Sequence, residues 1–188
     1  ISLEEGWANP AHHDELVRRY TDHIRLVADA GYKQLICFSG NRGAISDQEG
    51  LDNCVMGLQR ILPDAQAAGV TVVMELLNSK VDHPDYMCDH SLWGIELCRR
   101  LDTPNFGLLY DIYHMQIMEG DVIHTINDHN RWLVHYHTAG NPGRHEIDDN
   151  QELYYPAICR AIRDSGFTGY LAQEFIPSSK DPAIAAQA

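Results

Sequence analysis

The chain alternates between short apolar runs and longer amphipathic stretches. The apolar runs are rich in Val, Ile, Leu, Phe and Tyr and have the length of buried strands, at 34–39, 71–77, 106–113, 132–137 and 170–175. Polar and apolar positions recur with helical spacing between them, which predicts helices over 14–30, 47–68, 88–101, 119–128 and 152–165. This alternation of helix and strand indicates an α/β fold with a parallel sheet.

Several residues mark the ends of these helices. Glycines follow three of the helical patterns, at Gly31, Gly69 and Gly166, and Ser46 begins a capping pattern. Pro63 lies inside the second pattern, so we expect a kink or break in that helix.

Metal-capable side chains stand at the ends of four of the five apolar runs. They are Glu75, Asp111, His137 and Glu174, separated by 36, 26 and 37 positions. Each interval is about one strand-plus-helix unit of roughly 30 residues. Since parallel strands joined by helical crossovers all run the same way, we expect the four side chains to converge on one face.

Burying these groups in separate strands needs a common explanation. An unsatisfied buried carboxylate or imidazole costs several kcal/mol, so separate buried salt bridges are the less favoured interpretation. One bound divalent cation satisfies all four, and three carboxylates with one imidazole suit Mn²⁺, Mg²⁺ or Co²⁺, with Zn²⁺ as a further occupant.

Size and charge narrow the class of protein. At 188 residues and 44% hydrophobic, the chain has enough material for one domain over 1–188. The net charge of −13 disfavours nucleic acid and anionic membranes as partners, and the apolar runs are far shorter than a membrane span. Five cysteines without a CxxC pair favour reduced thiols, so we expect a soluble cytoplasmic protein. Because the chain starts at Ile1, its natural amino terminus is expected further upstream.

Four segments taken together carry a family resemblance. The segments MELLNS, DIYHMQ, HYHTAGNPGRHE and QEF resemble those of the sugar isomerase/epimerase TIM-barrel superfamily (xylose isomerase-like), and NPGR is most similar to the hydroxypyruvate isomerase branch. The resemblance spans about 5–180 and implies a TIM (β/α)8-type barrel. Only five βα units are present, matching strands four to eight. We therefore expect a partial barrel that lacks its N-terminal units and has two open edges.

The resemblance also implies roles for individual residues. The metal ligands would be the four strand-end residues, Glu75, Asp111, His137 and Glu174, and the first and last would form a catalytic acid/base pair. The third ligand varies between His and Gln in this family.

Substrate contacts are expected at three further positions, two of them implied by the resemblance. His114 would contact substrate oxygens, and Arg144 would hold an anionic or hydroxyl group, for which its planar fork is suited. His135 shares a strand face with His137 and is expected as a pocket or core histidine rather than a metal ligand, with substrate contact as a further role that the resemblance does not supply. Arg144 lies in the longest irregular stretch, 138–150, and such loops are usually functional.

The leading hypothesis is a metal-dependent isomerase of small hydroxy-keto acids or sugars that works through an enediolate, similar to hydroxypyruvate isomerase. The alternatives are a ketose 3-epimerase on the same scaffold, an endonuclease IV-like DNA repair nuclease, which the negative charge disfavours, and a non-catalytic barrel. Homo-oligomerisation stays open. Six further histidines are expected on the solvated surface, at His12, His13, His83, His90, His124 and His129.

Overall fold

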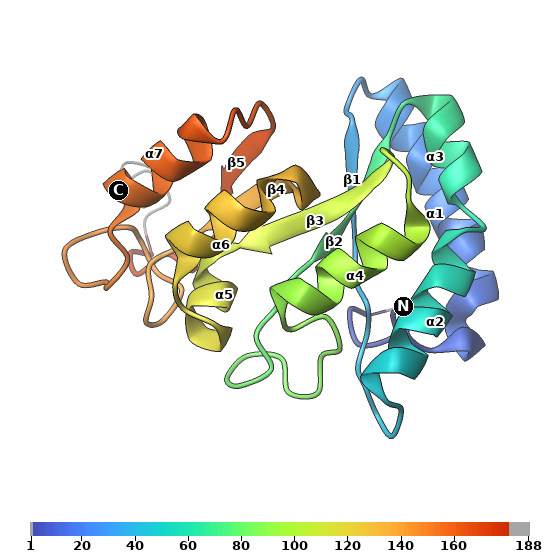
Figure 1. Ribbon diagram of the computed structural model, residues 1–188, viewed down its shortest axis with the longest axis horizontal. Helices are drawn as coiled ribbons and strands as arrows, with labels where there is room; N and C mark the ends of the chain where they lie inside the picture. Colours follow the sequence, from blue (N-terminus) through green and yellow to red (C-terminus); the bar gives the residue numbers. More distant parts are fainter. Residues whose placement is uncertain (1, 181–188) are drawn as a thin grey trace.

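A curled parallel sheet lies at the centre of the computed structural model, which describes residues 2–180 (Figure 1). The described strands are β1 (Gln34–Cys37), β2 (Thr71–Glu75), β3 (Phe106–Asp111), β4 (Leu133–Thr138) and β5 (Tyr170–Gln173). They pair in chain order, each parallel to the next. The predicted α/β partial barrel of five units is confirmed.

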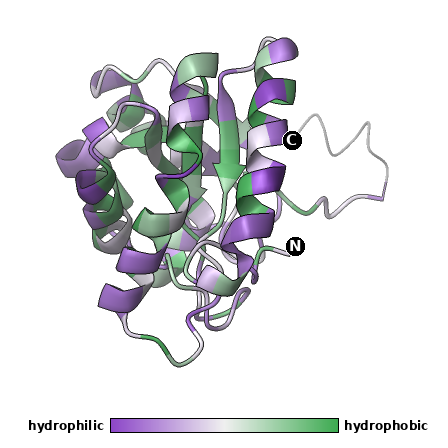
Figure 2. Ribbon diagram, turned by 90° about the vertical axis from the view of Figure 1, so that its right-hand side faces the viewer, coloured by the Kyte–Doolittle hydropathy of each residue, from purple (hydrophilic) through white to green (hydrophobic). Residues whose placement is uncertain are grey.

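Helices join the strands and pack against the sheet. They are α1 (His13–Asp29), α2 (Asp47–Leu58), α3 (Leu62–Ala68), α4 (Ser91–Leu101), α5 (Ile112–Met118), α6 (Val122–His129) and α7 (Tyr155–Asp164), with short 3-10 turns η1 (Pro10–His12) and η2 (Asn130–Trp132). Figure 2 shows hydrophobic strands behind helices that carry both hydrophilic and hydrophobic residues.

The sheet curls far enough for β1 to reach β4, although the two strands are not neighbours in it. The side-chain amide of Gln34 on β1 donates to the carbonyl oxygen of Val134 at 2.8 Å, and its Oε1 lies 2.6 Å from Nδ1 of His135. A flat sheet would keep these strands about three strand spacings apart, near 14 Å. The contact therefore shows the curvature of a barrel.

Burial falls from the middle of the sheet to its edge. Every residue of β3 is buried, whereas Tyr170 and Leu171 on β5 are 55% and 44% exposed. Within residues 2–180, β1 and β5 each pair on one side only. The expected open edges are present, and they leave apolar residues of β5 in contact with solvent.

The predicted helix over 47–68 is interrupted. It forms two helices, α2 and α3. The first begins after the N-cap Ser46, whose hydroxyl accepts from the backbone N–H of Glu49 at 3.2 Å. Pro63 lies in the first turn of α3, where its missing N–H leaves no helical hydrogen bond unmade. The expected break is confirmed.

The end of β3 differs from the expectation. The strand ends at Asp111 and α5 begins at Ile112, so the predicted strand over 106–113 was too long. The sequence pattern predicted one helix over 119–128 and did not predict α5, which precedes it. The reason is that residues 112–115 are buried like the strand before them, and an uninterrupted apolar run does not reveal its period. The remaining helices begin within three residues of their predicted starts.

None of the described helices is long and apolar enough to cross a membrane.

Candidate metal centre

The sheet register brings the strand-end residues together. Asp111 and His137 are direct partners across β3 and β4. Glu75 ends β2, and Glu174 follows β5, where its backbone N–H donates to the carbonyl of Thr138 at 3.0 Å. All four side chains therefore stand at the carboxyl end of the parallel sheet, where such folds place their reactive groups.

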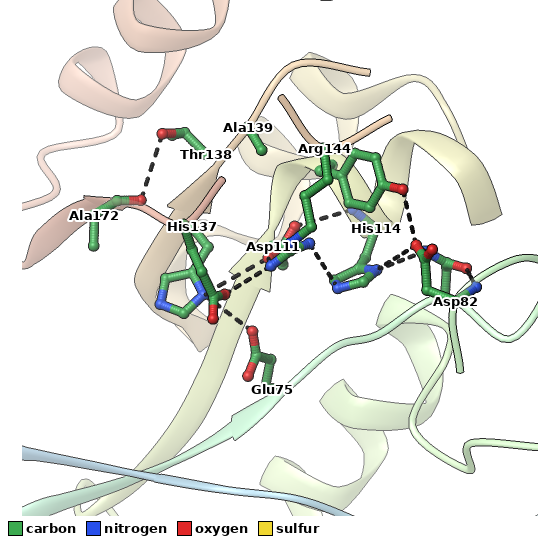
Figure 3. Close-up of polar contacts among 12 residues, drawn as sticks. Glu75, Asp82, Asp111, His114, His137, Thr138, Ala139, Arg144 and Ala172 are labelled. Atoms are coloured by element: carbon green, nitrogen blue, oxygen red, sulfur yellow. Dashed lines mark hydrogen bonds and ion pairs between the residues drawn. The ribbon is translucent and has the colours of Figure 1, made fainter. Parts of the chain in front are cut away.

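One donor atom from each of the four side chains lies within 4.8 Å of the others. The Nδ1 atom of His137 is close to one oxygen of each carboxylate, at 3.0 Å (Glu75), 2.7 Å (Glu174) and 3.6 Å (Asp111). Figure 3 shows the His137 ring turned toward Glu75 and Asp111. The structure thus brings together all four predicted ligands.

The four groups are not equally buried. Glu75, Asp111 and His137 are 5%, 1% and 6% exposed, whereas the side chain of Glu174 is 53% exposed. The expectation of four buried groups is wrong for Glu174, because β5 is an edge strand with no neighbour on its outer side in the described residues.

The cluster holds its imidazole in the charged form. Burial lowers the pKa of His137, but its contacts with the carboxylates of Asp111, Glu174 and Glu75 outweigh this effect and raise it to about 11. Burial also works against the charge of Asp111, yet its contacts with His137, His114 and Arg144 lower the pKa to about 2. The three carboxylates therefore attract a cation into the space between them, and the fourth donor, an imidazole, is one that divalent metals accept.

The two glutamates are pushed in opposite directions. Burial raises the pKa of Glu75, whereas the hydrogen bond from His137 lowers that of Glu174 despite partial burial. Paired carboxyl groups with separated pKa values are a common arrangement for acid and base work.

Arg144 reaches the cluster from the loop after β4. The bond between Asn141 and Pro142 is cis, and Gly143 (φ 91°) and Arg144 (φ 58°) both have left-handed backbones. This turn directs the guanidinium inward, where Nη2 donates to Asp111 at 2.9 Å and to Glu174 at 2.7 Å. A left-handed conformation is uncommon for an arginine and is often found at functional sites.

The two other predicted substrate residues lie next to the cluster. His114 is buried on α5, its Nε2 lies 2.8 Å from Nη1 of Arg144, and burial lowers its pKa to about 4. The ring centroid of His135 lies 5.1 Å from that of His137, and burial lowers its pKa to about 4 as well. Its Nδ1 faces Gln34, and its buried Nε2 has no hydrogen-bond partner.

A cavity of about 530 Å³ adjoins the cluster. Glu75, Glu174, His114 and Arg144 form its polar side, together with Asp82 and His83, and the apolar side is lined by Leu3, Phe38, Leu77, Phe175 and Ile176. The prediction that His83 has only a solvated surface role is wrong, because it lines this cavity beside His114. His13 is also buried, with Nε2 2.8 Å from the carbonyl of Trp7.

The geometry fits one hard divalent cation. Four donors within 4.8 Å match a single coordination sphere, and the set holds three oxygens and one nitrogen. Within the described part of the chain, this is the cluster of His, Cys, Asp and Glu side chains close enough to hold a metal.

Comparison with known proteins decides the family. The family model for the xylose isomerase-like TIM barrel matches residues 2–188. The chain belongs to this family. A similar solved structure is the crystal structure of an AP endonuclease, family 2, from Brucella melitensis. Its TM-score is 0.85 at 28% identity, over 93% of this chain and 67% of that one.

Curated relatives of this xylose isomerase-like chain are named isomerases. A 2-oxo-tetronate isomerase of Cupriavidus necator is 34% identical over 113 residues, which is 60% of this chain and 43% of the relative. The hydroxypyruvate isomerase of Escherichia coli is 26% identical over 161 residues, which is 85% of this chain and 62% of the relative. The matched part thus spans 43% of the length of the first relative and 62% of that of the second.

Four polar residues near the cavity were not identified from the sequence. Asn78, Asp82 and His83 follow β2, and Tyr113 lies on α5. A signal existed for the first three, because loops after the carboxyl ends of parallel strands carry functional residues in barrels of this family type. Tyr113 gave none, because its position looked like part of an apolar strand.

Proposed function

We propose that the protein is a metal-dependent isomerase of small hydroxy-keto acids, similar to hydroxypyruvate isomerase. The observation that carries this proposal is that two glutamates with opposite pKa shifts, Glu75 and Glu174, enter one compact donor cluster beside the guanidinium of Arg144. The names of the relatives support the same reaction class.

Glu75, Asp111, His137 and Glu174 would together hold the cation, with Mn²⁺, Mg²⁺ or Co²⁺ suited to the oxygen-rich set and Zn²⁺ as a further occupant. When bound, the cation would stabilise the negative charge that develops on substrate oxygens. A bound cation would also offset the mutual repulsion of the three carboxylates.

The two glutamates would move one carbon-bound proton. With hydroxypyruvate, one carboxylate removes a proton from the hydroxymethyl carbon, which gives an enediolate, and a carboxyl group returns a proton to the neighbouring carbon. The hydroxyl proton passes to the former carbonyl oxygen, so the product is tartronate semialdehyde and no oxidant is needed.

Arg144 and His114 would bind the substrate. The fork of Arg144 suits a carboxylate, which distinguishes a keto acid from a neutral ketose. His114 lies 2.8 Å from Arg144 and faces the same cavity. The role of His135 in substrate contact stays a prediction.

The test compares acids with neutral sugars. Protein stripped of metal and resupplied with Mg²⁺, Mn²⁺ or Co²⁺ is incubated with hydroxypyruvate, with 2-oxo-tetronate and with a neutral ketohexose, and products are separated by chromatography. We expect metal-dependent conversion of the acids and little of the ketohexose. Faster epimerisation of the ketohexose would favour the 3-epimerase alternative, and cleavage of abasic DNA would favour the nuclease.

A matched pair of variants tests the carboxylate contact. Arg144→Ala should lose activity on the acids, whereas Arg99→Ala, which removes an exposed arginine of α4 that pairs with Glu96, should not. Equal activity of both variants on hydroxypyruvate would contradict the role of Arg144.

A further inference from the structure

Glu174 stands at the least supported side of the cluster. Within residues 2–180, β5 pairs only with β4, and the side chain of Glu174 is 53% exposed. Its backbone N–H donates to the carbonyl of Thr138 at 3.0 Å. The end of an exposed edge strand opens easily unless the chain beyond it is tied down. The contacts of residues 175–178 therefore decide how firmly Glu174 is held.

The chain beyond Glu174 runs along the loop after β4. The N–H of Ile176 donates to the carbonyl of Arg144 at 2.6 Å, and the carbonyl oxygen of Ile176 lies 2.8 Å from Nδ1 of His145. Both contacts use backbone groups of Ile176, so they do not depend on its side chain. The two segments therefore lie side by side two residues after Glu174.

Ser178 is held by a side chain of the same loop. Its N–H lies 3.0 Å and 3.2 Å from the two carboxylate oxygens of Glu146, and its hydroxyl donates to Oε2 at 2.7 Å. Both donors belong to one residue, so one carboxylate fixes the backbone and the side chain of Ser178 together. Hydrogen bonds to an ionised acceptor are about twice as strong as those between neutral groups. This contact is therefore stronger than the neutral backbone hydrogen bond at Ile176.

Glu146 is buried, and the loop folds back closely to place it. The residue is 7% exposed, and a buried carboxylate costs free energy unless hydrogen bonds satisfy it. The N–H of Gly140 donates to the carbonyl of His145 at 2.8 Å, and a Cβ atom at Gly140 would lie 2.3 Å from the carbonyl oxygen of Glu146. Only glycine permits this close approach. A solvated surface glutamate needs neither the burial nor the close packing.

We propose that Glu146 is a positioning residue that holds the chain after β5 and so keeps Glu174 in the cluster. The connection is short, because Ser178 is four residues from Glu174 and Ile176 between them is fixed to the same loop. The consequence for Glu174 as a metal ligand rests on the proposed function. A carboxylate that is already held in place loses less conformational freedom when a cation binds, so binding is tighter.

The direct test is amide hydrogen exchange, followed by NMR in protein without metal. In Glu146→Ala, we expect the amides of Glu174 and Ile176 to exchange at least about tenfold faster, because their segment opens more often. The amide of Ala139, which donates to the hydroxyl of Tyr155 at 3.0 Å, should keep its rate. Unchanged exchange at Glu174 and Ile176, or an equal rise at Ala139, would overturn the proposal.

Two further variants separate positioning from loss of stability. Glu146→Gln keeps an acceptor oxygen for the N–H of Ser178, so exchange at Ile176 should lie between that of the unmodified protein and that of Glu146→Ala. This milder variant decides the question if Glu146→Ala does not fold. Ser46→Ala removes the N-cap of α2 and should leave exchange at Ile176 unchanged. A rise at Ile176 in Ser46→Ala as large as in Glu146→Ala would contradict a local role.

The second readout is Mn²⁺ affinity, measured by calorimetry in a double-mutant cycle. Loss of a residue that orients a metal ligand typically costs about 10- to 100-fold in metal affinity. We expect Glu146→Ala to weaken Mn²⁺ binding by this factor in the unmodified protein and in Glu75→Gln. In Glu174→Ala the same change should have little effect, because the ligand that Glu146 positions is already absent. An equal loss in all three backgrounds would contradict action through Glu174.

The two readouts also separate this proposal from the proposed function. If the unmodified protein binds no Mn²⁺, the proposed function fails, and the exchange rates still decide whether Glu146 holds Glu174 in place. If Mn²⁺ binds but no keto acid is converted, both readouts still apply and only the assigned reaction fails.

Discussion

His137 carries a proton that a metal ion has to displace. The pKa of its imidazole is raised to about 11, and its side chain is only 8% exposed. This pKa lies about four units above pH 7. At about 1.4 kcal/mol per unit, removing the proton from His137 at pH 7 costs on the order of 5 kcal/mol. Metal affinity is therefore expected to rise about tenfold per pH unit, because the raised pKa keeps the competing proton bound at every pH below about 11.

Isothermal titration calorimetry of Mn²⁺ measures this proton directly. Titrations at pH 7 in two buffers of different ionisation enthalpy give the number of protons released, and we expect about one from His137. The variant His137→Gln keeps an oxygen donor but has no titrating group, so the release should fall by about one proton. The difference between the two proteins separates the imidazole from Glu75, whose pKa is also raised.

The neighbouring histidine of the same strand supplies the control. Burial lowers the pKa of His135 to about 4, so its ring is neutral at pH 7 and has no proton to lose. His135→Gln should release the same number of protons as the unmodified protein. If the unmodified protein binds Mn²⁺ without proton release, or if His137→Gln releases as many protons, the claim that the metal displaces a proton from His137 is refuted.

Three further outcomes follow from the structure. Mn²⁺ at 100 times its Kd should raise the free energy of unfolding by about 2.7 kcal/mol, measured by chemical denaturation, because the four donors meet only in the folded chain. Asp111→Asn should lose this increase in stability but keep the N-cap of α5. Asp111→Ala should also lose the hydrogen bond from the backbone N–H of His114, so its free energy of unfolding should be about 1 kcal/mol lower than that of Asp111→Asn. Equal stability of the two variants would contradict the capping role. Ser46→Ala should lower stability by about 1 kcal/mol with unchanged metal affinity, since Ser46 caps α2 far from the cluster.

Much of the fold could be predicted from the sequence because its strands are short apolar runs separated by helical patterns. The parallel order follows from that alternation, and the break near Pro63 follows from the chemistry of proline. The boundary at Asp111 could not be placed, because Ile112 and Met115 are as buried as the strand and conceal the change from extended chain to helix.

The site could likewise be predicted only in part from the sequence. Spacing along the chain identifies residues at strand ends, and the register then brings Asp111 opposite His137. Contacts within loops follow no such period. The inward turn of Arg144 depends on two left-handed residues, and the orientation of Asn78 depends on backbone N–H groups of its own loop. Such details are set by loop conformation, which periodicity does not describe.

The central claim is that Glu75 and Glu174 transfer a carbon-bound proton, and exchange with heavy water tests it most directly. Protein saturated with Mg²⁺ is incubated with hydroxypyruvate in D₂O. The rate at which deuterium enters carbon–hydrogen positions is measured by NMR, and the rate without protein is subtracted. We predict incorporation by the unmodified protein and by Glu96→Gln, an exposed control on α4, and rates lower by about 100-fold or more in Glu75→Gln and Glu174→Gln. Undiminished exchange in both glutamate variants, with Mg²⁺ still bound, would contradict the claim.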